Sequence, residues 1–169
     1  MFRRSICLSS TVSLKTDFAH LPRKMTVDFA GLWLARRRRV EADVTSAQEV
    51  WKLSGAGSVG GQVLTGLPLI ARLAARPDCT VWPFDPPGGN LMLAEVYPSL
   101  LAAEVHAATP PEGIKDEVQV RLLARALLRL AQNGGLQALM SDIPDWPGCQ
   151  EEGWILGAGH EAALKGALR

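Results

Sequence analysis

The clearest hydrophobic pattern in the sequence lies between residues 115 and 132. Apolar side chains recur there every three or four positions, which places them on one face of a helix. They are Val118, Leu122, Leu123, Leu127 and Leu130. Acidic residues occupy the first turn, where the helix dipole favours them, and Asn133-Gly134-Gly135 follows the last turn. The pattern predicts an amphipathic helix over residues 115–132.

Two short apolar segments in the middle of the chain predict strands. They are residues 80–84 and 91–97, and both are rich in branched, aromatic or large apolar side chains. Between them, residues 85–90 hold two prolines, two glycines, an aspartate and an asparagine, a composition typical of a turn. We therefore expect a β-hairpin, with Pro98 ending its second strand.

Shorter helices are expected around this pair of strands. Residues 31–48 form one, and residues 62–76 form two, because Gly66 and Pro68 interrupt the pattern. Three more are expected over residues 98–107, 136–141 and 160–168. The mixture predicts an α/β domain in which helices flank a small sheet.

Composition places the chain among globular proteins. Its 169 residues fit one domain, and 47% hydrophobic with 21% charged residues is an ordinary globular balance. The net charge of +1 provides no global field toward nucleic acid or membrane, and no apolar run reaches the roughly 18 residues of a membrane span. Three widely spaced cysteines without a CxxC pair argue against disulfides and a zinc site. We expect a soluble cytoplasmic protein with no membrane partner.

The first twenty residues differ from the rest of the chain. They are basic and rich in hydroxyl side chains, and they lack the strong apolar centre of a secretory signal. We expect a poorly ordered leader over residues 1–20 and one domain over residues 21–169.

Four consecutive arginines, residues 36–39, lie inside the helix expected over residues 31–48. Successive helical residues point about 100° apart, so these side chains surround the helix instead of forming one stripe. One interpretation is contact with a phosphate backbone. The other, which we favour, is a solvated helix whose arginines pair with Glu41 and Asp43.

A glycine-rich loop offers an alternative function. Gly55, Gly57 and Gly60 match the dinucleotide fingerprint, whose glycines let the backbone approach a pyrophosphate at a helix start. The preceding segment is not a buried run of valine and isoleucine, since Lys52 and Ser54 interrupt it. Binding of a nucleotide or dinucleotide at this loop is therefore an alternative function for the chain.

Glu95 is the most informative single acid. Because side chains alternate along a strand, it shares a face with Leu91, Leu93 and Tyr97. A carboxylate in that position is costly unless it is paired, hydrogen-bonded or bound to a cation. It is either part of a metal site or neutralised by Arg72 or another arginine.

Three segments in order resemble one family. They are residues 51–72 (WKLSGAGSVGGQVLTGLPLIAR), residues 81–99 with VWPF and AEVYPS, and residues 114–119 (IKDEVQ), with EEGWILG near the end. They resemble the carboxy-terminal part of a bacterial family of predicted RNase H-like nucleases, some of whose members carry a cobalamin-biosynthesis label. The likeness spans roughly residues 21–160.

The resemblance implies a partial RNase H-like fold and metal-dependent cleavage of phosphodiesters in nucleic acid. Carboxylates would hold Mg²⁺ or Mn²⁺, which prefer hard oxygen ligands. Glu95 in AEVYPS and Asp116 in IKD match the family's acids, so the resemblance assigns these two as catalytic and metal-binding residues. The family's D-x-S and D-F-P-F-G-like strands are absent from this sequence, and Asp17 and Asp28 do not replace them.

Two acids without the amino-terminal strands predict an RNase H-like relative that is inactive by itself. The missing strands would also leave an exposed sheet edge, through which copies of the chain could associate. A non-catalytic interaction domain and a nucleotide-binding module are the two alternatives.

Overall fold

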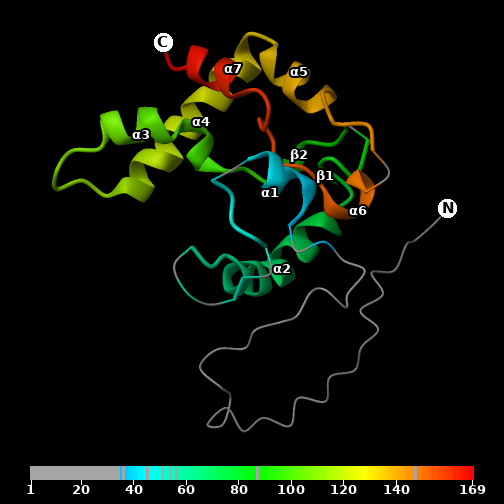
Figure 1. Cartoon of the computed structure of the whole chain (residues 1–169). Coiled ribbons are helices and arrows are strands. Elements are labelled where there is room, and N and C mark those ends of the chain that lie inside the picture. The colour runs from blue at the N-terminus through cyan, green and yellow to red at the C-terminus, as the bar shows by residue number, and fades with distance from the viewer. Residues whose placement is uncertain are drawn as a thin grey trace, which may run out of the picture. The chain divides into compact units, whose positions relative to one another are not determined.

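Helix α4 (Lys115–Gln132) lies at the centre of the helical part of the fold (Figure 1). Its bounds confirm the amphipathic pattern, and the side chains that it buries are Val118, Leu123, Ala126 and Leu130. The elements that pack against it are the 3-10 helix η2 (Pro98–Leu101), α3 (Ala102–Ala108), α5 (Gly135–Ser141) and α7 (Glu161–Gly166). Leu101 and Leu164 are fully buried in this core. The three short helices expected over residues 98–107, 136–141 and 160–168 are therefore confirmed.

The structure is a computed structural model that describes residues 35, 37–44, 46–50, 52–53, 55, 57–86, 88–146 and 148–169. All of them belong to one unit, residues 35–169. The leader predicted over residues 1–20 lies outside the described residues, and the domain boundary stays a prediction. The remaining elements are α1 (Arg39–Asp43), α2 (Gly60–Ala74), β1 (Cys79–Val81), β2 (Leu91–Leu93) and α6 (Cys149–Glu152).

The two strands form a parallel pair, so the predicted β-hairpin is wrong. Cys79 lies opposite Leu91, and Val81 lies opposite Leu93. The α/β class itself is confirmed, as helices accompany this small parallel sheet. The pair is extended by a parallel bridge between Glu95 and Ile155.

The loop between the strands explains the parallel pairing. After β1 the chain turns at once, and the N–H groups of Phe84 and Asp85 both donate to the carbonyl of Val81 at 2.9 Å. The loop then returns to the start of β1, where the N–H of Leu91 donates to the carbonyl of Asp78 at 3.0 Å. Gly89 has a φ of +73°, and a Cβ there would collide with the Asp78 backbone. Residues 85–90 have the composition of a turn, but they belong to a loop that returns to the start of β1 and not to a hairpin.

Helix α2 is continuous over 15 residues, which corrects the prediction of two short helices. Pro68 lies inside it, and neither Gly66 nor Pro68 ends it. Nothing lies within 4 Å of a Cβ built on Gly66, so this part of the helix faces open space. Of the described elements, α2 packs mainly against β1.

Helix α1 is shorter than the expected segment. The prediction ran to residue 48, but α1 ends at Asp43. Val44 is extended and buried, and the chain beyond it runs to the segment that follows β2, where the hydroxyl of Tyr97 donates to the carbonyl of Ser46. The part of the prediction before residue 35 lies outside the described residues.

One edge of the sheet is closed by local hydrogen bonds. The N–H of Val81 donates to Asp85 Oδ2 at 2.8 Å, and the N–H of Cys79 donates to the carbonyl of Arg76 at 3.2 Å. On the other strand, the backbone groups of Ala94 and Val96 form no hydrogen bond with another described residue. Among the described residues, the backbone groups of Ala94 and Val96 are therefore unpaired, whereas those of Cys79 and Val81 are paired. Within the described residues, no helix has the length and apolarity that crossing a membrane requires.

Candidate functional site

Glu95 lies just after β2, and its carboxylate is held by one arginine. Arg38 Nη1 donates to Glu95 Oε2 and Arg38 Nη2 donates to Oε1, both at 2.8 Å. This is a bidentate pair, the strongest common geometry between a guanidinium and a carboxylate. The Glu95 side chain is 47% exposed, whereas that of Arg38 is 13% exposed. The sequence allowed an arginine as the partner of Glu95, and Arg38, not Arg72, takes that role.

Arg38 also holds a second acid. It stands at the start of α1, and its Nε donates to Glu41 Oε1 at 2.7 Å. Its Nη1 also donates to the carbonyl of Glu152 at 3.2 Å. Burial opposes the charged form of Arg38, but the hydrogen bonds and charges of Glu95 and Glu41 outweigh it and raise the pKa of the guanidinium. Arg38 is thus a fixed cation between two carboxylates.

Glu41 is the buried member of this cluster, with 1% of its surface exposed. Besides the Arg38 side chain, it accepts hydrogen bonds from the N–H of Arg38 and from the N–H of Val50, both at 3.1 Å. Three hydrogen-bond donors offset the cost of burying this carboxylate. Glu41 therefore joins the start of α1 to residues 46–50, and Arg38 joins both to Glu95, in the segment after β2, and to α6. We call Arg38, Glu41 and Glu95 the carboxylate clamp.

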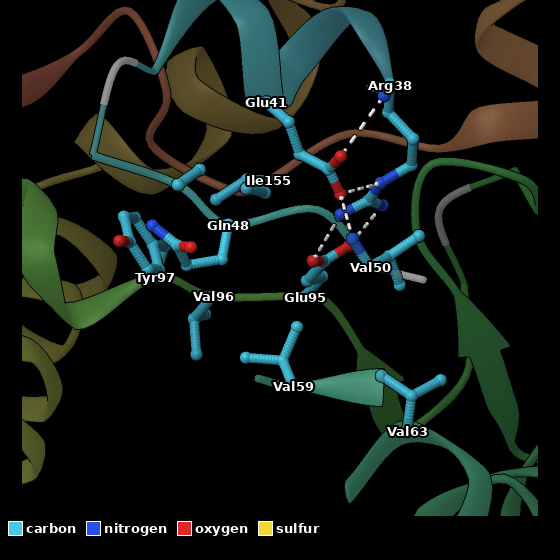
Figure 2. A pocket seen from close by; sticks show the side chains of 11 residues that line it. Arg38, Glu41, Gln48, Val50, Val59, Val63, Glu95, Val96, Tyr97 and Ile155 are labelled. Atoms are coloured by element: carbon cyan, nitrogen blue, oxygen red, sulfur yellow. Dashed lines mark hydrogen bonds and ion pairs between the residues drawn. The ribbon is translucent and has the colours of Figure 1, made fainter. Parts of the chain in front are cut away.

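A pocket of about 160 Å³ lies beside the carboxylate clamp. Figure 2 shows Arg38 between Glu41 and Glu95, with Val59 and Val63 at the far side of the pocket. The other residues that line it are Ala47, Gln48, Val50, Val96, Tyr97 and Ile155. The charged groups of the pocket are already paired with each other, so its free lining is mainly apolar.

Asp116, the other predicted metal ligand, is exposed in the first turn of α4. It does not line the pocket that contains Glu95. In the part of the chain that the structure describes, no three histidine, cysteine, aspartate or glutamate side chains are grouped as metal ligands would be. Both oxygens of Glu95 are bound by Arg38, so the described residues around Glu95 do not fit a divalent metal.

The glycine-rich loop has an internal reason for its glycines. Gly55 and Gly57 have φ values of +88° and +72°, which favour glycine. A Cβ on Gly60 would lie 2.9 Å from the Lys52 carbonyl and 2.8 Å from Leu53 Cδ2. Residues 46–50 and 52–53 are not a strand, so the strand that precedes a dinucleotide loop is not found among the described residues. The close contact that requires glycine at position 60 is therefore with Lys52 and Leu53 of the same chain.

The described arginines of the basic run pair with acids. Arg39 Nε lies 3.8 Å from Asp43 Oδ2, and Arg37 Nε lies 3.8 Å from Glu49 Oε1. Together with the Arg38–Glu41 pair, these distances confirm the interpretation of arginines paired with acids. The difference is that Glu41 is buried and Arg38 is mostly buried, rather than both being solvated.

Comparisons with protein-family models, curated proteins and solved structures found no match to this chain. The RNase H-like assignment therefore rests on the quoted motifs. Sequence reasoning paired the arginine run with Glu41 but did not predict that Arg38 joins Glu41 to Glu95. A local signal was present, because a glutamate at the third helical position commonly reaches back to the N–H of the residue that caps the helix. Glu41 does this with Arg38.

Proposed function

We propose that this chain carries the carboxy-terminal part of an RNase H-like fold and acts as a non-catalytic interaction domain, inactive as a nuclease by itself. The order of the motifs AEVYPS, IKDEVQ and EEGWILG supports the lineage. A mixed α/β arrangement with parallel strands is consistent with it.

The bidentate pair between Arg38 and Glu95 is the main observation behind the proposal that the chain is inactive as a nuclease. A nuclease centre needs carboxylates that are free to bind Mg²⁺ or Mn²⁺. Displacing Arg38 from Glu95 would leave a mostly buried guanidinium with only one of its two carboxylates. Glu95 is better explained as the exposed end of the carboxylate clamp, which fixes α1 to the segment after β2.

The interaction part of the proposal rests on helix α2. Its large apolar side chains other than Leu73 are exposed, although the chain has a separate buried core around α4. Contiguous apolar surface of this kind marks protein interfaces more often than free surface.

Calorimetric titration of Mg²⁺ and Mn²⁺ into the full chain tests the proposal that it is inactive as a nuclease. We expect no saturable binding up to about 5 mM metal, because the ligands that Mg²⁺ needs are not assembled. The variants Glu95→Ala and Asp116→Ala are compared with Asp145→Ala, an exposed acid outside the pocket. Saturable binding that is lost in the first two variants and kept in the third would contradict the proposal.

A further inference from the structure

Helix α2 presents an uncharged apolar surface to solvent. At 100° per residue, six apolar positions fall within roughly 120° of its circumference. We call them the α2 stripe, and they are Val63, Leu64, Leu67, Ile70, Ala71 and Ala74. All six are exposed, with Leu64 and Leu67 at 61% and 48%. Figure 1 shows α2 apart from the group formed by α3, α4, α5 and α7.

The sequence of α2 is too poor in helix formers to be stable without packing. Gly61, Gly66 and Pro68 lie within it. Relative to alanine, an interior glycine costs about 1 kcal/mol and an interior proline about 3 kcal/mol. Even alanine-rich helices of about 15 residues are marginal alone in water. The packing of α2 against β1 leaves the stripe exposed, so an apolar surface that covers the stripe would add to the stability of α2.

The chemistry of the stripe selects the kind of surface that covers it. No charged residue belongs to it, and Arg72, the charged residue of this helix, points roughly 140° away from the stripe's centre. Nucleic acid requires cations at the surface that it contacts. An acidic protein surface would likewise find no cation on the stripe. The partner surface is apolar and uncharged.

A second copy of this chain supplies such a surface. The apolar area extends past the stripe to Leu53, which touches the Gly60 position, and to Val96, which lines the same pocket as Val63. Together these side chains expose on the order of 500 Å² per copy, so a symmetric contact buries about 1,000 Å² in total, the lower limit for a specific interface. An antiparallel arrangement aligns the two helix dipoles favourably and keeps the two copies of Arg72 apart.

We propose that the α2 stripe is a homodimer interface, in which α2 packs antiparallel against α2 of a second copy about a twofold axis. The proposal rests on the interaction role proposed above and names its partner. Leu67 is the middle residue of α2, so the twofold axis passes near it and the two copies of Leu67 face each other.

Sedimentation equilibrium of the full chain tests the dimer. We expect a dimer at about 50 μM protein, and we expect Leu67→Glu to raise the dissociation constant at least about 100-fold, since it buries a carboxylate at the axis. Leu69→Glu is the matched control, because Leu69 is 58% exposed on the opposite side of the same helix. A monomeric wild-type chain, or equal effects of the two variants, would overturn the proposal.

A cysteine pair gives a second readout that does not depend on a charged variant folding. Leu67→Cys should form an intermolecular disulfide within minutes of mild oxidation, whereas Leu69→Cys should not. Equal crosslinking of both variants would contradict the twofold contact. Metal titration is independent of these measurements: a monomer that binds no metal would overturn the dimer alone, and a dimer that binds metal through Glu95 would overturn the inactive assignment alone.

Discussion

Removing the two acids of the carboxylate clamp one at a time should give very different losses of stability. Glu41 is 1% exposed and accepts three hydrogen bonds, from the Arg38 backbone, the Arg38 side chain and the Val50 backbone. Glu95 is 47% exposed and accepts two, both from Arg38. The prediction compares Glu41→Ala with Glu95→Ala.

The expected losses follow from what each change leaves behind. Glu41→Ala removes the acceptor of Arg38 Nε and of two backbone N–H groups, and it leaves the mostly buried guanidinium with Glu95 as its only carboxylate; breaking a buried ion pair in this way costs about 3–5 kcal/mol of unfolding free energy. Glu95→Ala leaves Arg38 paired with Glu41 and with the Glu152 carbonyl. Since Glu95 is about half exposed, its loss should cost about 1 kcal/mol.

Urea denaturation followed by tryptophan fluorescence measures both losses, because Trp82 and Trp154 are buried. With a slope of about 2 kcal/mol per molar urea, a loss of 4 kcal/mol lowers the midpoint by about 2 M. Asp43→Ala is the control, since its pair with Arg39 is exposed and should contribute less than about 0.5 kcal/mol. Equal losses for Glu41→Ala and Glu95→Ala, or a loss below about 1 kcal/mol for Glu41→Ala, would refute the reasoning.

Three other predictions concern single positions outside the clamp. Gly148→Ala should destabilise the fold by about 1–3 kcal/mol in the same urea assay, because its Cβ would overlap the ring of Trp146; an unchanged midpoint would contradict that packing. Gly66→Ala should instead raise the unfolding free energy by about 0.5–1 kcal/mol, because the helix has open space there, and a loss would show that the position is covered. Burial, followed by the charge of nearby Glu152, raises the pKa of the Cys149 thiol. Peptide mass spectrometry should therefore find Cys149 alkylated by iodoacetamide only after urea is added, and rapid labelling of the native chain would contradict its burial.

The helical core could be predicted from sequence because its signals are local. Local features specify α4: its buried side chains are spaced as on one helix face, at Val118, Leu123 and Leu130, and Asn133-Gly134-Gly135 ends the helix. The strand pairing could not be predicted in the same way. Residues 85–90 have the composition of a turn in either a hairpin or a return loop, and the hydrogen bonds to the Asp78 carbonyl decide between them.

The candidate site was predicted in part for a similar reason. The alternation of residues 91–97 identified Glu95 as a carboxylate that needs a partner. The partner Arg38 lies 57 positions earlier, and no periodicity links the two. Glu41 is buried through contacts with Val50 that exist only once residues 46–50 fold back. Local pattern thus found the acid, and tertiary structure supplied the pair.

The most direct test of the central claim is a cleavage assay with the purified full chain. End-labelled single-stranded and double-stranded RNA and DNA oligonucleotides are incubated with about 5 mM Mg²⁺ or Mn²⁺, the metals that would serve an acidic nuclease centre. If Arg38 holds Glu95 as a structural group, no product should form above the level of buffer alone. Cleavage that Glu95→Gln abolishes and Asp145→Asn leaves intact would contradict the account.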